Sequence, residues 1–190
     1  MVIASQLRAG MAIRYEGQAY RVVACDYHPG QGKMGGTAHV RLQNLSTGTL
    51  WETSFRPELR LEDLPVERRT LSFLYTDAGQ SWFMDPNSYE QTAIPNQMLG
   101  DRARFLEGEM LLQVEFVQER PVNVLFPDIL EVRIAETAPP VHQQADSTWK
   151  SATLENGAVV MVPQFIKPGD MIRLDVTAMR YMDRVKSAGR

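Results

Sequence analysis

The sequence predicts an all-β protein built from three small β units in series. Helical periodicity is almost absent, and turn signals rich in Gly, Asn, Asp and Pro recur about every ten residues, as in small barrels or sandwiches. Two breaks in the strand pattern, at Pro65 and at Phe126 to Asp128, divide the 190 residues into thirds. We therefore expect units at 1–64, 65–128 and 129–190, each with a thin core.

The first third holds the most informative segment, a glycine-dense turn between two strand-like runs. Residues 18–25 are rich in β-formers, and residues 39–45 alternate polar and apolar side chains. We expect a hairpin whose tip presents Lys33, a hydrated charge on a long flexible stem. Taken alone, the segment is more typical of a mobile, solvated turn than of a functional tip. The loop residues expected to support Lys33 are Gly30, Gln31, Gly32, Met34, Gly35 and Gly36.

The other two thirds show further short elements. The runs 71–75 and 81–84 predict a hairpin, and the segment 96–106 predicts one short helix that Gly100 weakens. In the last third, a strand starts at Ile129 and a polar, proline-bearing stretch from 138 to 149 predicts a long loop. Lys150, which follows that loop, is expected to be a surface lysine at the start of a strand.

Charge and composition exclude several classes of protein. A net charge of −3 argues against nonspecific coating of nucleic acid. The middle third carries five Lys or Arg against ten Asp or Glu. This acidic excess indicates either a solvated surface or a part that faces protein or solvent while the first and last thirds of the chain touch RNA. The start of the chain has no basic, apolar leader, and no run of eighteen apolar residues occurs, so we expect a cytoplasmic protein without a membrane span. Cys25, the single cysteine, is expected to be a buried, inert thiol.

No constellation typical of catalysis stands out. The histidines are scattered without partners at metal-ligand spacing, which predicts no metal site. Gly32 and Lys33 resemble the end of a phosphate-binding loop, but Tyr27 and Met34 stand where that motif needs Gly and Ser or Thr. A lysine nucleophile would need burial or a cationic neighbour to lower its pKa, and a glycine-rich tip supplies neither. These residues therefore predict no catalytic site.

Each third of the chain also contains a longer motif of its own. The most specific one runs from Lys150 to Gly169, KSATLENGAVVMVPQFIKPG, and is followed by YMDR at 181–184. Earlier motifs are LRAGM at 7–11, VRLQNLSTG at 40–48 and FMDPNSYEQ at 83–91. Over essentially the whole chain, these segments resemble the bacterial translation elongation factor P family.

The resemblance implies both a fold and a function. The fold would be an N-terminal SH3-like barrel of the KOW type and two OB-fold barrels, arranged as an L that mimics a tRNA. The function would be to bind the 70S ribosome beside the peptidyl-tRNA and to stimulate peptide-bond formation at consecutive prolines. Lys33 aligns with the family's functional lysine, which reaches the peptidyl-transferase centre. The protein would be a monomeric accessory to catalysis rather than an enzyme, with ribosomal RNA and tRNA as partners.

The resemblance also implies roles for individual residues. Arg41 would contact tRNA phosphates, although a solvated barrel face is an equally good interpretation. Tyr181 and Arg184 would contact RNA of the small subunit, unless Tyr181 belongs to the core. No cofactor is implied, but Lys33 would be a candidate for post-translational modification by a lysine-modifying enzyme. Gln31 stands where the family usually has proline, which leaves recognition by any particular enzyme open.

One loop departs from the family pattern. Residues 141–148 lack the Gly-Asp-Thr motif that approaches the exit-site codon in many members. A diverged paralogue with other stalling sequences is therefore an alternative. A general OB-type RNA-binding module is a second alternative, with Trp149 as a candidate exposed aromatic residue.

Overall fold

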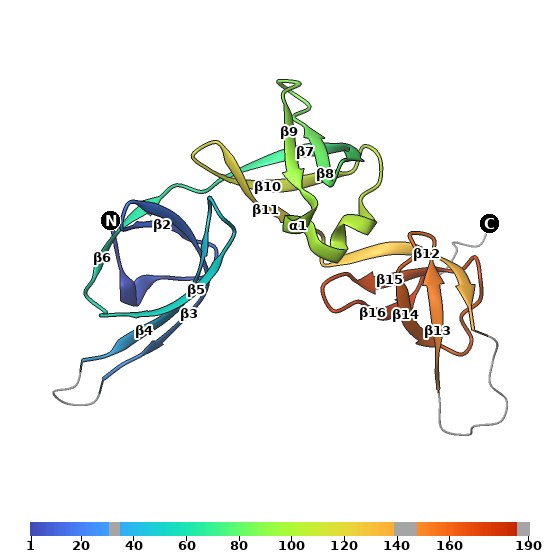
Figure 1. Cartoon of the computed structure of the whole chain (residues 1–190). Coiled ribbons are helices and arrows are strands. Elements are labelled where there is room, and N and C mark those ends of the chain that lie inside the picture. Colours follow the sequence, from blue (N-terminus) through green and yellow to red (C-terminus); the bar gives the residue numbers. More distant parts are fainter. Residues whose placement is uncertain (31–34, 139–147, 186–190) are drawn as a thin grey trace. The chain divides into compact units, whose positions relative to one another are not determined.

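The structure is a computed structural model, and it describes residues 1–30, 35–138 and 148–185. These residues form three β-sheets, which confirms the predicted all-β class (Figure 1). The chain packs into two compact units. The first contains residues 1–70 and 113–124, and the second contains residues 71–112 and 125–190. The first unit is therefore discontinuous in sequence.

The first sheet has six strands in the order β1-β6-β2-β3-β4-β5. Burial alternates along β4, where Ala38, Val40 and Leu42 face the core while His39 and Arg41 are exposed, because successive side chains of a strand point to opposite faces. The elements are β1 (Val2–Ile3), the 3₁₀ turn η1 (Ala4–Gln6), β2 (Ala12–Tyr15), β3 (Gln18–His28), β4 (Thr37–Asn44), β5 (Leu50–Phe55) and β6 (Arg60–Leu64).

Cys25, expected to be buried, is half-buried on β3. Desolvation by burial, followed by the charge of Asp26, raises the pKa of its thiol. The thiolate is the reactive form of cysteine, so a raised pKa fits the expected inert thiol.

The second sheet has the order β11-β10-β7-β8-β9. The predicted hairpin is present, and β7 pairs with β8. The helix expected over 96–106 is present only in part: the segment splits at Gly100, whose φ of +58° ends the α-helix and leaves a 3₁₀ turn behind it. The elements are β7 (Glu67–Asp77), β8 (Gln80–Met84), β9 (Gln91–Pro95), α1 (Asn96–Leu99), η2 (Gly100–Phe105), β10 (Leu111–Val117) and β11 (Arg120–Leu125).

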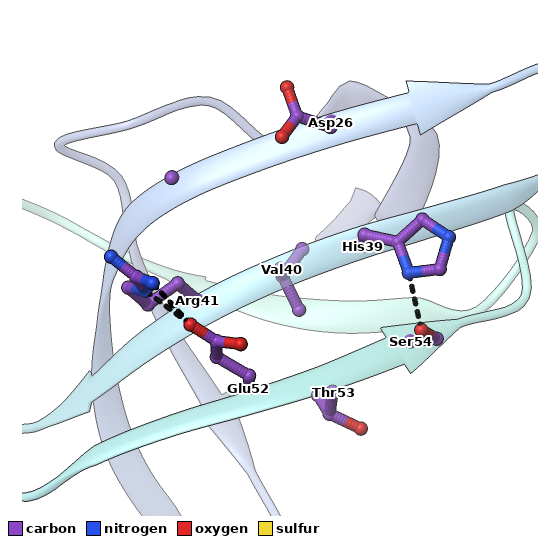
Figure 2. A pocket seen from close by; sticks show the side chains of 8 residues that line it. Asp26, His39, Val40, Arg41, Glu52, Thr53 and Ser54 are labelled. Atoms are coloured by element: carbon purple, nitrogen blue, oxygen red, sulfur yellow. Dashed lines mark hydrogen bonds and ion pairs between the residues drawn. The ribbon is translucent and has the colours of Figure 1, made fainter.

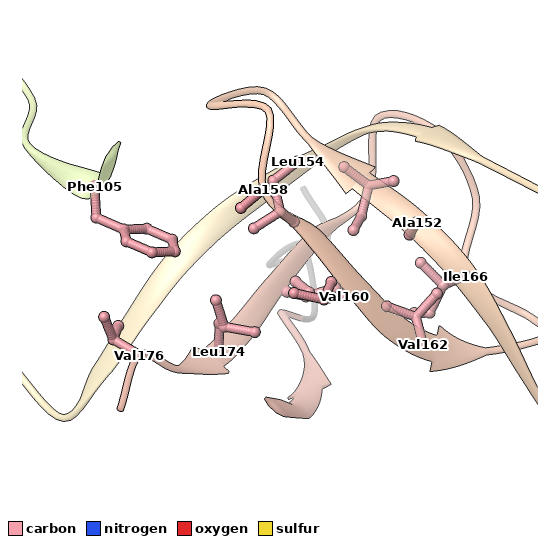
Figure 3. Packing of buried hydrophobic residues seen from close by; sticks show 11 residues of the cluster. Phe105, Ala152, Leu154, Ala158, Val160, Val162, Ile166, Leu174 and Val176 are labelled. Carbon is pink, nitrogen blue, oxygen red and sulfur yellow. The ribbon is translucent and has the colours of Figure 1, made fainter. Parts of the chain in front are cut away.

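The third sheet has the order β14-β13-β12-β15-β16. Its core joins aliphatic side chains of these strands with Phe105, which η2 contributes (Figure 3). Residues 139–147, the greater part of the expected long loop, lie outside the described residues. The strands are β12 (Ile129–Thr137), β13 (Trp149–Leu154), β14 (Val159–Pro163), β15 (Met171–Asp175) and β16 (Arg180–Arg184).

Lys150 is not the surface lysine that the sequence predicts. Its exposed fraction is 6%, because alternation along β13 turns Lys150, Ala152 and Leu154 to the inward face. The Lys150 ammonium donates a hydrogen bond to the hydroxyl of Thr137 at 3.3 Å. Its polarity favoured the surface, whereas its register on the strand places it inside.

Within the described ranges, no helix is long and apolar enough to span a membrane.

Candidate functional site

Strands β3 and β4 form an arm that projects from the first barrel (Figure 1). Their register runs from Val22 opposite Leu42 at the base to His28 opposite Thr37 at the end, with an irregularity between Val22 and Ala24. Of the predicted loop residues, Gly30, Gly35 and Gly36 lie next to the ends of these strands. Gln31, Gly32, Lys33 and Met34 lie outside the described residues.

Gly36 lies where the two strands of the arm approach each other closely. A Cβ atom at this position would come within 2.8 Å of the carbonyl oxygen of His28 and 3.0 Å of the Tyr27 hydroxyl. Real side chains do not tolerate such a distance to backbone, so the close approach requires glycine here. The sequence predicts a glycine-rich turn, but only the structure assigns this task to Gly36.

The outward face of the arm and of β5 holds a pocket of about 540 Å³ (Figure 2). Its polar side chains pair across the strands. His39 Nδ1 lies 2.7 Å from the Ser54 hydroxyl, and the Arg41 guanidinium donates to the Glu52 carboxylate at 2.6 Å. Sequence reasoning missed Ser54 and Glu52, which become neighbours of β4 only through the register of β5.

Arg41 is half-exposed and already has an anionic partner, because it forms an ion pair with Glu52. A phosphate that contacts Arg41 must therefore displace the Glu52 carboxylate or share the guanidinium with it.

The structure brings two of the scattered histidines together. The rings of His28 and His39 lie edge to face with their centroids 5.4 Å apart. Among the residues that the structure describes, no group of three or more His, Cys, Asp or Glu side chains could hold a metal ion.

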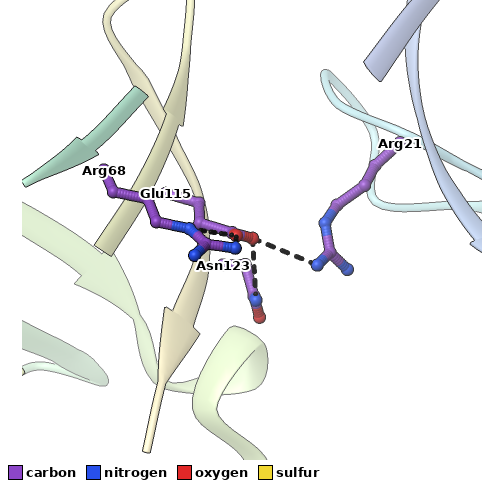
Figure 4. A network of polar contacts seen from close by, with 4 residues as sticks. All are labelled: Arg21, Arg68, Glu115 and Asn123. Carbon is purple, nitrogen blue, oxygen red and sulfur yellow. Dashed lines mark hydrogen bonds and ion pairs between the residues drawn. The ribbon is translucent and has the colours of Figure 1, made fainter. Parts of the chain in front are cut away.

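A buried carboxylate of the second sheet contacts β3 near the base of the arm, and sequence reasoning missed it. The side chain of Glu115 on β10 is 4% exposed and accepts hydrogen bonds from Arg21 on β3, Arg68 on β7 and Asn123 on β11 (Figure 4). Burial alone would raise the pKa of Glu115. The hydrogen bonds from Asn123 and Arg68 and the charge of Arg21 outweigh it, so the pKa is lower than usual. The one signal in the sequence is a charged residue inside the apolar run LLQVEFV.

The remaining predicted RNA contacts lie on β16, in the second unit. Tyr181 packs against the core of the third sheet, and its ring centroid lies 6.1 Å from that of Trp149. Burial raises the pKa of the Tyr181 hydroxyl. The guanidinium of Arg184 lies 5.9 Å from the ring centroid of Phe165 and 3.9 Å from Asp170. The alternative that Tyr181 contributes to the core therefore has direct support.

Comparison with known proteins matches each third of the chain to a family model. Residues 3–61 match the elongation factor P KOW-like domain, and residues 66–124 match the elongation factor P OB domain. Residues 130–184 match the C-terminal model of elongation factor P. The KOW-like and OB assignments agree with the fold that the resemblance implied.

Individual relatives match over nearly their whole length. The chain is 34% identical over 187 residues to elongation factor P of Clostridium kluyveri, covering 97% of this chain and 100% of the relative. It is 35% identical over 187 residues to elongation factor P of Bartonella bacilliformis, covering 97% of each. A solved structure of eukaryotic translation initiation factor 5A from Methanococcus jannaschii aligns with a TM-score of 0.48 and 20% identity, over 65% of this chain and 92% of that one. From the three family models and the full-length relatives, the chain belongs to the elongation factor P family.

Proposed function

We propose that this protein is a translation elongation factor that binds the ribosome beside the peptidyl-tRNA and stimulates peptide-bond formation at consecutive prolines. The observation that supports this most is the identity of about one third to proteins named elongation factor P, over nearly the whole chain. We also propose three domains, at 1–64, 65–128 and 129–190, and the matched ranges 3–61, 66–124 and 130–184 support them.

Lys33 is the residue that carries the proposed mechanism. In the sequence it lies between the strand ends His28 and Thr37, and the last residues of β3 before it, 26–28, are exposed. Its ammonium contacts the backbone at the acceptor end of the peptidyl-tRNA and holds the prolyl ester in reach of the incoming amine. Proline is a poor substrate because its ring restricts the backbone, and orientation of two reactants lowers a barrier by several kcal/mol. Lys33 makes and breaks no bond, so the protein assists the reaction without being an enzyme.

Other residues support the same orientation in this proposal. Arg41 exchanges Glu52 for a tRNA phosphate, since both partners of this ion pair are exposed and such pairs contribute little to stability. Arg184, whose side chain is half-exposed, contacts ribosomal RNA in the small subunit, with Tyr181 holding the end of β16 against the core.

Lys33 is also the proposed site of modification. An extension added by a lysine-modifying enzyme lengthens the reach of the cation, and Gln31 is the position at which such an enzyme meets an unusual side chain. The protein acts as a monomer in the cytoplasm, where its partners are the ribosome and peptidyl-tRNA.

The test is a reconstituted translation system that lacks its own factor and reads a reporter with consecutive prolines. We expect the protein purified from its native cell to restore full-length product. Stimulation by Lys33→Ala should be at least about tenfold lower than by the native protein. The matched control is Lys167→Ala, which removes an exposed lysine from a turn of the other unit. The thermal midpoint should stay unchanged in both variants.

Two outcomes contradict the proposal. Failure of the native protein to restore product excludes the function, and tight binding of single-stranded RNA without ribosomes would then support a general OB-type module. Equal stimulation by the native protein and Lys33→Ala removes the role of the lysine.

A further inference from the structure

Glu115 is the one buried carboxylate among residues 1–30, 35–138 and 148–185. Two of its partners, Arg68 and Asn123, belong to the second sheet, as does Glu115 itself. The third partner, Arg21, is the only one that the first sheet contributes, and its Nη2 lies 3.2 Å from the carboxylate (Figure 4). All four residues belong to the same compact unit.

Arg21 depends on this contact more than Glu115 does. Without Arg21, the carboxylate keeps hydrogen bonds from Arg68 at 3.1 Å and from Asn123 at 3.0 Å. Arg21 is only 20% exposed, and its buried Nε has no hydrogen-bond partner within the described part of the chain. Burying a guanidinium with only some of its hydrogen bonds made lowers the free energy of unfolding. The position of Arg21 therefore indicates a role beyond local stability.

An apolar cluster lies beside the charged contact. Apolar burial is non-directional, so such a surface holds two elements together without fixing their rotation. A charge-assisted hydrogen bond is directional and can fix it. The cluster consists of the buried side chains Ala12, Leu64, Val117 and Val122, with Ala19, Leu45 and Val66 packed against them.

We propose that Arg21 and Glu115 are positioning residues that set the orientation of the first barrel on the β10–β11 hairpin. Because Arg21 lies on β3, the strand that continues into the arm, the same contact sets the direction of the arm. The functional part of this inference rests on the proposed role of the arm in translation. The structural part stands without it.

The first test measures orientation directly. In a Cys25→Ser background, spin labels at Glu58→Cys on the barrel and Gln113→Cys on β10 report one distance distribution within this unit. We expect Arg21→Met, which keeps an apolar stem but removes the charge, to broaden or shift that distribution. The matched control Arg14→Met removes another arginine of the same barrel, whose partner Glu62 lies 3.0 Å away on the neighbouring strand β6, and should leave the distribution unchanged.

The second test measures stimulation of the consecutive-proline reporter. A displacement of about 1 Å can cost up to a hundredfold in a reaction that depends on orientation, so we expect about a tenfold loss for Arg21→Met. Glu115→Gln should lose activity in the same way, and Arg21→Lys, which keeps the charge, should recover part of it. Arg14→Met should retain full stimulation.

Each negative result has a distinct meaning. An unchanged distance distribution in Arg21→Met and in Glu115→Gln overturns the positioning role. A broadened distribution with full stimulation overturns the link from this contact to the arm. If Lys33→Ala keeps full stimulation, the proposed function fails while the distance measurement still decides the structural part.

Discussion

The two ends of strand β3 differ in almost every respect. At the base, Val22 is fully buried opposite Leu42, and Arg21 reaches a buried carboxylate on another sheet. At the far end, Asp26 and His28 are exposed, and the described polar contacts of this end of the arm stay within the first sheet. The strand irregularity between Val22 and Ala24 separates the two halves. One strand thus serves as an anchor below and as an exposed extension above, and substitutions should separate these tasks.

The largest loss of stability is expected in the buried half. Leu42→Ala removes a fully buried side chain and leaves a cavity, and we expect the free energy of unfolding to fall by about 2–5 kcal/mol. Urea denaturation measures this, with Leu50→Ala as control, because Leu50 is mostly exposed on the adjacent strand β5. Equal losses for the two variants would show that burial of Leu42 does not anchor the base.

Glu115→Gln should lower the free energy of unfolding by less than Leu42→Ala, and the size of the loss should depend on pH. Losing the charge on a buried, hydrogen-bonded group costs about 1–3 kcal/mol at neutral pH. The folded-state pKa of Glu115 is lower than the ordinary value of 4.5, so its ionised form stabilises the fold above that pH and the benefit is lost as pH falls through the folded pKa. The difference between the native protein and the variant should therefore be constant above about pH 5.5 and shrink in acid.

The control for this pH series is Glu62→Gln, which removes an exposed carboxylate from the ion pair with Arg14. Its cost should stay below about 1 kcal/mol. A pH-independent difference for Glu115→Gln would mean that Glu115 is not ionised in the folded protein.

The smallest effect on stability is expected on the exposed face of the arm. Arg41→Gln breaks an ion pair whose side chains are both more than half exposed, and the free energy of unfolding should change by less than about 1 kcal/mol. If Arg41 contacts a phosphate, the variant should weaken ribosome binding and reduce its dependence on salt. A loss of stability as large as that of Leu42→Ala would contradict the contrast between the anchored residues and the exposed face of the arm.

Much of the fold could be predicted from the sequence because its signals are local. The alternation in Thr37–Asn44 and the hairpin at residues 71–84 depend on neighbours in the chain, and both are present. The surface position predicted for Lys150 was wrong, because its register on the strand, and not its polarity, determines that the side chain points inward. The helix over 96–106 is only partly correct, because the φ of Gly100 divides it into a short α-helix and a 3₁₀ turn.

The Glu115 network could not be predicted, since its members at positions 21, 68, 115 and 123 meet only in the folded chain. The pocket on the arm has the same origin, because Ser54 and Glu52 reach β4 through tertiary register. Lys33 was identified from the family motif, and its role stays a prediction.

The discontinuity of the first unit has a consequence for synthesis. Arg21 and Glu115 are separated by 94 residues, and the residues between 70 and 113 belong to the other unit. At about 5–20 residues per second, a nascent chain waits roughly 5–20 seconds between making these two partners. During that interval, the apolar side chains of Ala12 and Leu64 have no Val117 or Val122 to cover them. The solubility of the unfinished chain therefore depends on how quickly the inserted segment is completed.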